Sequence, residues 1–73
     1  MKKEFCKYRK QVGINITELR ERAGLTIEDL ATLLEIGPQK LQRIEAGTIN
    51  ATVSILQKLK KALGCTYAEI LQQ

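Results

Sequence analysis

The placement of glycine and proline constrains what this chain can fold into more than any other feature. The five glycines, at positions 13, 24, 37, 47 and 64, fall between segments whose apolar residues recur every three or four positions. The only proline, Pro38, directly follows Gly37. This punctuation is typical of short amphipathic helices with brief joints, and no segment alternates as a strand does. The sequence therefore predicts an all-α fold.

Capping residues set the expected helix boundaries. Five helices are expected: from about Val12 or Ile14 to Ala23, from Thr26, from Pro38 to Gly47, from Thr52 to Gly64, and from Thr66 onward. Thr26 with Asp29, and Thr66 with Glu69, have capping-box spacing. Residues 1–12 either extend the first helix or form a separate basic arm, because Gly13 and Asn15 weaken a continuous helix.

The apolar residues at helical spacing are expected to form one core. They are Val12, Ile16, Leu19 and Ala23, then Ile27, Leu30, Ala31, Leu33 and Leu34, then Ile36, Leu41 and Ile44, then Val53, Leu56, Leu59, Ala62 and Leu63 with Ile55 beside them, and finally Ile70 and Leu71. Only "EIG" separates the second expected helix from the third. So short a joint makes the two helices cross steeply, as in a helix-turn-helix, and leaves one face of the later helix free.

The positive charge is concentrated at the start of the chain. The 73 residues carry a net charge of +4. Residues 1–13 hold five basic side chains and one acidic one, 5 − 1 = +4, and residues 14–73 hold seven of each sign. A basic segment on a neutral body indicates an anionic partner, although a solubilising tail would have the same composition.

Several function classes are excluded by what the sequence lacks. It has no histidine, and Cys6 and Cys65 are too far apart to form a CxxC pair, so we expect no metal, no cofactor and two reduced thiols. Ser54 is the only serine and has no evident activating base, so we expect no enzyme. No apolar run could span a bilayer and no secretory signal is present, which predicts a cytoplasmic protein without membrane contact.

Short motifs over residues 13–71 resemble the lambda repressor/Cro-like (XRE-type) family of DNA-binding domains. They are "LRERAGLT", "LA..L", "RIEAG", "L.K..KALG" and a terminal "EIL", in that order. The resemblance implies a compact five-helix domain over residues 13–73, preceded by the basic segment of residues 1–12. It also implies that the third helix lies in the major groove of double-stranded DNA and that the second lies across the backbone.

The resemblance assigns the DNA contacts to particular positions. They fall at Pro38, Gln39, Lys40 and Arg43 with Gln42 beside them, and at Thr26 and Ile27 where the second helix starts. Gln39 can pair with the N6/N7 edge of adenine, and Arg43 with guanine O6/N7 or a phosphate. Lys40 suits a phosphate. Free amides at the starts of the second and third helices suit phosphates too. Arg20, by contrast, is expected to bond Glu45 in a structural role.

The sequence departs from the family pattern at four places. Ile27 stands where many members have a phosphate-binding glutamine, Glu35 where a left-handed glycine is usual, and Pro38 where a polar base-reading residue is common. The joint "TINA" carries no charge where many members are basic. These changes remove phosphate contacts, which the basic segment could restore through Lys2, Lys3, Lys7, Arg9 and Lys10.

Two functions are compatible with this pattern. The first is a transcriptional regulator, acting as a repressor that occupies an operator, with dimers formed through the last helix or the arm; Tyr67, Ile70 and Leu71 are the candidate contacts. The alternative is a protein-interaction module of the same fold, such as an antitoxin or the partner of another regulator. The neutral body and Ile27 motivate the alternative.

Overall fold

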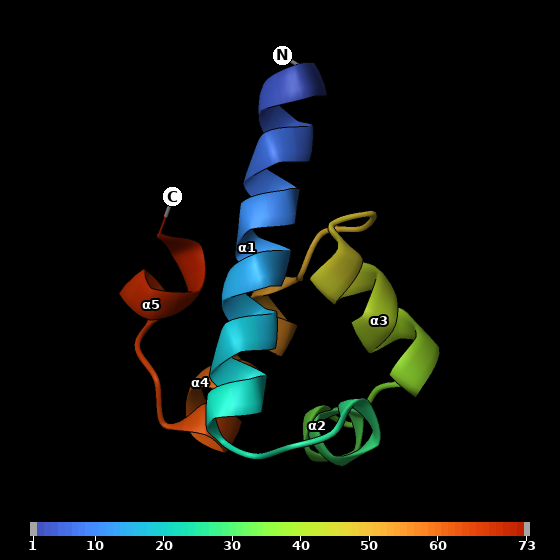
Figure 1. Cartoon of the computed structure of the whole chain (residues 1–73), viewed down its shortest axis with the longest axis vertical. Helices are drawn as coiled ribbons and strands as arrows, with labels where there is room; N and C mark the ends of the chain where they lie inside the picture. Colours follow the sequence, from blue (N-terminus) through green and yellow to red (C-terminus); the bar gives the residue numbers. More distant parts are fainter. Residues whose placement is uncertain (1, 73) are drawn as a thin grey trace.

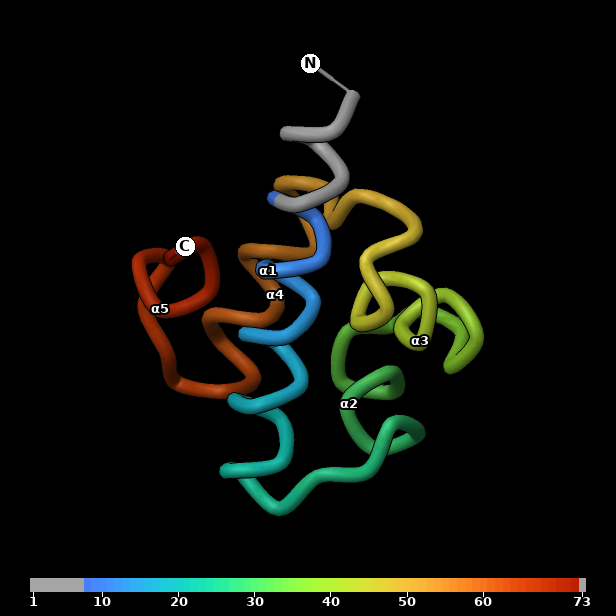
Figure 2. The backbone as a smooth tube through the Cα atoms, turned by 45° about the horizontal axis from the view of Figure 1, so that its top comes forward, coloured from blue at the N-terminus to red at the C-terminus, as the bar shows by residue number. Residues whose placement is uncertain are grey.

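Helices account for most of residues 2–72, the part of the chain that the computed structural model describes, with side chains described from Tyr8 onward. In this part the five helices are α1 (Lys2–Arg22), α2 (Ile27–Leu34), α3 (Pro38–Ala46), α4 (Val53–Leu63) and α5 (Tyr67–Leu71). The helix α1 packs against α3 and α5, and α2 packs against α3 and α4. As a result α2 and α3 lie on one side of α1, and α5 lies on the other (Figures 1 and 2).

The helix caps expected from the sequence are confirmed. Thr26 forms a capping box with Asp29 at the start of α2, and Thr66 forms one with Glu69 at the start of α5. The Thr52 hydroxyl accepts a hydrogen bond from the Ile55 amide, and Pro38 occupies the first turn of α3. Each of these devices acts within one turn of the chain, which is why the sequence alone predicts them.

The helix α1 runs from Lys2 through Gly13 and Asn15 to Arg22, so it includes the residues for which the sequence left a helix extension or a separate arm open. A polar side chain such as Asn15 weakens a helix by competing for its backbone groups. Here the Asn15 amide instead donates to the carbonyls of Ile70 and Gln72, at 2.9 and 2.7 Å, and its oxygen accepts from Gln11 at 3.0 Å. These bonds attach α5 to α1. The division into an arm of residues 1–12 and a domain of residues 13–73 stays a prediction.

The core contains most of the apolar residues that were expected in it. The buried residues are Val12, Ile16, Leu30, Ala31, Leu34, Leu41, Ile44, Ile55, Leu59, Cys65 and Ile70. Three expectations were wrong: Ala23 is exposed, and Leu33 and Val53 are 52% and 70% exposed. At about 100° of turn per residue, Val53 lies about 200° from buried Ile55, so the two cannot share a face of α4. Leu33 lies beside the buried face of α2.

Gly13 lets α1 approach the last turn of α3, and its replacement by alanine is expected to be destabilising. An added Cβ would lie 2.7 Å from the carbonyl oxygen of Ile44, and closer still to that of Glu45. Both obstacles are backbone atoms, so the helices must separate. Although alanine favours the helix by up to about 1 kcal/mol, we expect Gly13→Ala to lower the free energy of unfolding by about 1–3 kcal/mol. Urea denaturation measures this change.

A control for Gly13→Ala is available in the same helix. Ile14 is 48% exposed, so Ile14→Ala should change the free energy of unfolding by about 0.5 kcal/mol or less. Equal stability of wild type and Gly13→Ala would show that α1 and α3 do not meet this closely.

Glu35 ends α2 in a left-handed conformation, and glycine there is expected to stabilise the protein. Its φ of 59° and ψ of 41° are unfavourable for a residue with a Cβ. Glu35→Gly should therefore raise the free energy of unfolding by about 1 kcal/mol, and the melting temperature by about 4–8 °C. The lost ion pair with Lys58, 3.6 Å long, involves a Glu35 side chain that is 78% exposed and contributes little.

The matched variant for Glu35→Gly is Glu35→Ala. It removes the same carboxylate but keeps the Cβ, so the melting temperature should not rise. A rise of the same size in both variants would assign the gain to the charge rather than to the backbone conformation.

Candidate functional site

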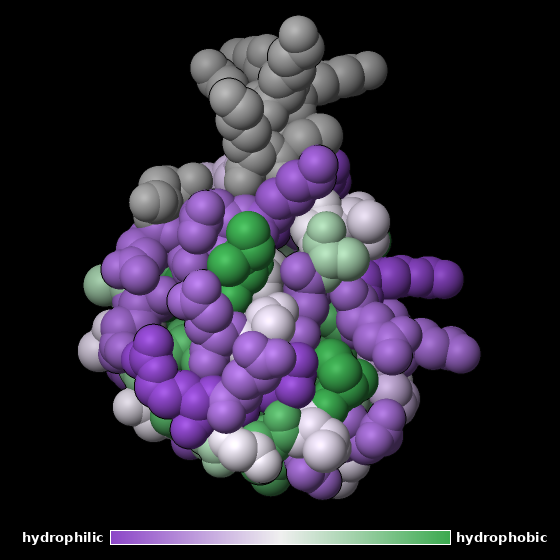
Figure 3. All heavy atoms as spheres, in the orientation of Figure 1, coloured by the Kyte–Doolittle hydropathy of each residue, from purple (hydrophilic) through white to green (hydrophobic). Residues whose placement is uncertain are grey.

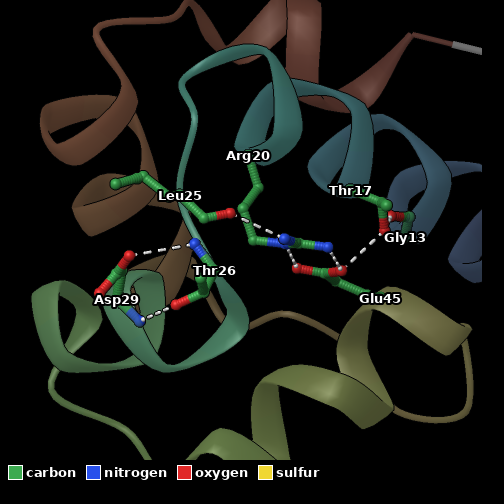
Figure 4. A network of polar contacts seen from close by, with 7 residues as sticks. All are labelled: Gly13, Thr17, Arg20, Leu25, Thr26, Asp29 and Glu45. Carbon is green, nitrogen blue, oxygen red and sulfur yellow. Dashed lines mark hydrogen bonds and ion pairs between the residues drawn. The ribbon is translucent and has the colours of Figure 1, made fainter.

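A network of polar side chains attaches α3 to α1 (Figure 4). Arg20 binds the Glu45 carboxylate through two nitrogens, Nε to Oε2 at 2.9 Å and Nη2 to Oε1 at 3.2 Å. Its third nitrogen, Nη1, donates to the Leu25 carbonyl at 2.9 Å. The two side chains are only 12% and 8% exposed. The structural role expected for Arg20 is confirmed.

Thr17 adds a further contact to the Glu45 carboxylate. This contact was not expected from the sequence. The Thr17 hydroxyl lies 2.8 Å from Oε1 of Glu45 and 2.9 Å from the Gly13 carbonyl, and its single proton can go to only one of them at a time. A sequence signal existed, since Thr17 precedes Arg20 by three residues and so lies on the same side of α1. The inner side of α3 is therefore held by both apolar and polar contacts.

The joint between α2 and α3 is closed by backbone bonds and by a lysine from α4. The Ile36 amide donates to the Ala31 carbonyl at 3.0 Å. The Lys58 ammonium lies 3.3 Å from the Leu34 carbonyl, where α2 ends. A cation suits the negative end of a helix dipole. Helical spacing gives no signal for this contact, because the two residues lie on different helices and are 24 positions apart.

The outer face of α3 is polar and open to solvent. Leu41 and Ile44 are buried, whereas the residues assigned to DNA contact on this helix, Pro38, Gln39, Lys40, Gln42 and Arg43, are all exposed. Neither Lys40 nor Arg43 takes part in an ion pair with another described residue. Figure 3 shows long hydrophilic side chains projecting from the side where α3 lies. We call these five residues the α3 polar face.

The two ends of α3 differ from each other in their hydrogen bonding. Gly37 caps the start of α3 without a side-chain hydrogen bond, and the first turn has no acidic residue. At the other end, the Arg43 carbonyl accepts from the Thr48 amide at 3.0 Å and from the Thr48 hydroxyl at 3.1 Å. The positive end of the α3 dipole is therefore open to an anion, and its negative end is closed.

The start of α2 fits a phosphate contact less well than the sequence suggested. Thr26 is exposed, but its hydroxyl and amide are both occupied by the capping box with Asp29. Glu28 and Asp29 place two carboxylates in the first turn, and these repel a phosphate. Ile27 is half-buried and packs against the core. Its assignment as a DNA contact is not favoured by this geometry.

The basic residues of α1 differ in their surroundings. Lys10 is exposed, and its backbone lies so close to Gly47 that an added Cβ there would be 2.6 Å from the Lys10 Cα. The backbone of Lys10 therefore lies beside the carboxyl end of α3. Arg9 is half-buried and lines a cavity. The side chains of Lys2, Lys3 and Lys7 lie outside the described ones.

The three residues expected in a dimer contact differ in how far they are exposed to solvent. Ile70 is fully buried, so its expected place on a dimer surface was wrong. It faces the core because it follows the Thr66 cap of α5 and packs under α1. Tyr67 is 40% exposed, with the Lys60 ammonium 4.9 Å from its ring centre, and Leu71 is half-buried.

No metal-binding cluster forms within the part of the chain that the structure describes. There, His, Cys, Asp and Glu side chains do not gather in groups of three or more that could hold an ion. Burial raises the pKa of the Cys65 thiol, and the Glu69 carboxylate raises it further. A thiol so held is a poor nucleophile. No described helix is both long and apolar enough to cross a membrane.

Known proteins resemble this chain in both sequence and structure. The model of the helix-turn-helix family HTH_3 matches residues 16–70. An uncharacterized HTH-type transcriptional regulator of Sinorhizobium fredii, y4dJ, is 38% identical over 63 residues, which are 86% of this chain and 82% of that protein.

Two solved structures confirm the predicted fold class. The clp gene regulator ClgR from Corynebacterium glutamicum has a TM-score of 0.83 at 26% identity, covering 88% of this chain and 68% of that one. The restriction-modification controller protein C.AhdI from Aeromonas hydrophila has a TM-score of 0.79 at 30% identity, covering 84% of this chain and 92% of that one. The first is named as a gene regulator and the second as a controller protein, and both share the arrangement of helices seen here.

Proposed function

The chain belongs to the HTH_3 helix-turn-helix family, and we propose that it is a DNA-binding transcriptional regulator whose α3 enters the major groove of double-stranded DNA. It acts in the cytoplasm as a repressor, by occupying an operator. The family is one of transcriptional regulators, which is not a class of enzymes.

The observation that carries this proposal is the α3 polar face. The five side chains of this face are exposed. On the opposite side of the same helix, Leu41, Ile44 and Glu45 pack against or bond to the rest of the domain. A helix fixed on one side and polar on the other can enter a groove about 12 Å wide without rearranging. Preorganisation of this kind lowers the entropy lost on binding.

Base recognition is assigned to Gln39 and Arg43. The Gln39 amide offers a donor and an acceptor to the major-groove edge of adenine, and the Arg43 guanidinium offers two parallel donors to guanine. The two residues are four positions apart and therefore lie on one side of α3. Together with Gln42 they line a shallow depression of the surface.

Phosphate contacts are assigned to Lys40, to Lys10 beside the end of α3, and to the open start of α3. Lys2, Lys3 and Lys7 extend the same basic sequence. Each neutralised phosphate releases counterions, so affinity must fall as salt rises. With three or more such contacts, the slope of log K against log salt concentration is about −3 or steeper.

Selection of bound duplexes from random DNA tests the proposal, followed by titration of the selected site from about 50 to 200 mM salt. We expect an enriched sequence and a fall in affinity of about 60-fold or more over that range. The control is a scrambled site of the same length. Absence of binding to any duplex at the lowest salt would refute the proposal.

A second function is favoured by the charge at the start of α2. Glu28 and Asp29 oppose a phosphate there, and residues 14–73 have no net charge. Both features suit a module that binds another protein. A stoichiometric protein complex that survives the loss of the Arg43 side chain would support this alternative.

A further inference from the structure

The shallow depression that Gln39, Gln42 and Arg43 line on α3 has two further residues in its walls, Ala46 and Thr48, to which the proposed function assigns no contact. Ala46 ends α3, and Thr48 belongs to the loop that follows it (Figure 1). Both are exposed, as are the other three. None of these five lining residues carries a carboxylate, so their side chains do not repel DNA.

Ala46 lies beside the side chains that were assigned to base recognition because of helical geometry. It follows Gln42 by four residues and Arg43 by three, and residues at these spacings are neighbours on the surface of a helix. Its side chain is a single methyl group, which cannot form a hydrogen bond. The depression is therefore polar where Gln42 and Arg43 lie, and it becomes apolar toward the carboxyl end of α3.

Thr48 reaches the same depression because the chain reverses its direction at Gly47. Gly47 is left-handed, with a φ of 78°, and the Thr48 amide donates to the Arg43 carbonyl at 3.0 Å. The Thr48 hydroxyl donates its only proton to the same carbonyl, at 3.1 Å. This bond holds the Thr48 side chain in one rotamer, so the methyl group on the same carbon has a fixed position as well.

Two methyl groups at fixed positions suit one feature of the major groove. Thymine presents a 5-methyl group there, and apolar contact with an alanine or with the methyl group of a threonine distinguishes it from the other bases. Ala46 is three residues from Arg43, which is about 4.5 Å along the helix axis, and stacked base pairs are about 3.4 Å apart. The two methyl groups therefore suit the base pair next to the one that Arg43 contacts.

We propose that Ala46 and Thr48 recognise the 5-methyl group of a thymine in the base pair next to the guanine bound by Arg43. This inference rests on the proposed function, because it requires α3 to lie in the major groove. The guanine is recognised by hydrogen bonds, and the thymine is recognised by removal of water from between three methyl groups. The hydrogen bond from the Thr48 hydroxyl to the Arg43 carbonyl both closes the end of α3 and positions the Thr48 methyl group.

Replacement of single thymines in the selected duplex by uracil tests the proposal, because uracil differs from thymine only in lacking the methyl group. At one thymine position we expect wild type to bind about fourfold more weakly, since the burial of one methyl group is lost. Replacement of any other thymine should leave the affinity unchanged. Replacement of guanines by 7-deazaguanine, which lacks the N7 acceptor, locates the guanine beside it: this change should weaken binding by wild type but not by Arg43→Ala. Fluorescence anisotropy measures each affinity.

Thr48→Ser separates the methyl group from the hydrogen bond. Serine keeps the hydroxyl that donates to the Arg43 carbonyl, so its melting curve should match that of wild type. The preference for thymine over uracil should fall from about fourfold to about twofold or less, because two methyl groups share the contact. Thr66→Ser makes the same change at the start of α5, on the other side of α1, and should keep the full preference. Any effect of uracil on the shape of the DNA would be the same for all three proteins.

The possible failures of this inference and of the proposed function are distinguishable. Equal binding of the thymine and uracil duplexes at every position would overturn the inference alone, because the duplex would still be bound. A sensitive thymine away from the Arg43 guanine, or an undiminished preference in Thr48→Ser, would also overturn it. The wild-type series requires no variant, so it decides the question even if Thr48→Ser does not fold. Absence of binding to any duplex would refute the proposed function, and the inference with it.

Discussion

Replacement of Glu45 by alanine is expected to lower the free energy of unfolding by about 3–5 kcal/mol. The Arg20 side chain is only 12% exposed, and without Glu45 its charge would remain buried with no opposite charge. Thr17 would lose an acceptor as well. A domain of this size has a total stability of about 4–11 kcal/mol, so the loss is a large fraction of it. Urea denaturation followed by circular dichroism measures the change.

Two further variants show whether the cost comes from the uncompensated charge. Glu18→Ala removes an exposed carboxylate from α1 and should change stability by about 0.5 kcal/mol or less. Replacing both partners, as Arg20→Met with Glu45→Met, should recover part of the loss, because neither charge is then buried alone. A cost below about 1 kcal/mol for Glu45→Ala would place this pair among ordinary surface ion pairs.

Removal of the Arg43 side chain is expected to weaken binding to the selected DNA site without changing the fold. One bidentate contact to guanine contributes about 1–3 kcal/mol of discrimination, which corresponds to a loss of about 5- to 150-fold in affinity. Arg43 is exposed and is in no ion pair among the described residues, so the melting temperature of Arg43→Ala should equal that of wild type. Fluorescence anisotropy with the selected duplex measures the affinity.

Two other basic residues serve as controls for Arg43→Ala, because they show whether the loss of affinity is specific to Arg43. Arg22→Ala removes an exposed arginine from the last turn of α1, away from α3, and should have little effect on binding. Lys40→Ala should weaken binding to all sequences alike, because a phosphate contact carries no base information. If Arg43→Ala binds the selected site as tightly as wild type, α3 does not read bases through this residue.

Much of the candidate site could be predicted before any coordinates. Pro38 and Gly47 delimit α3, and the spacing of Leu41 and Ile44 identifies its inner side, so the exposure of Gln39 and Arg43 followed from helical geometry. The left-handed conformation of Glu35 was anticipated from the family resemblance, which implies a left-handed glycine at this position. The role of Ile27 was less predictable, because a residue at the start of a helix can face either the core or solvent.

The prediction of buried residues was less accurate in α4, and the cause is simple. Val53, Ile55 and Leu56 are all apolar and lie within four consecutive positions, so helical periodicity allows more than one choice of buried face. Packing against the other helices decides in favour of Ile55, and leaves Val53 exposed. The same limit applies to α5, where five residues make too short a helix to define a stripe.

The sequence by itself determined where most helices begin and end and which side of α3 is polar, because caps, glycines and helical spacing act over three or four residues. Only the tertiary structure decided that α1 continues through Gly13 and Asn15, since the groups that make this possible lie in α3 and in α5, up to 57 positions away. The groove lined by Val12, Ile44, Ile49, Leu56 and Leu71 also required the structure, because these residues come from five separate segments. Contacts between distant segments leave no periodic signal in a single chain, so helical spacing alone does not predict them.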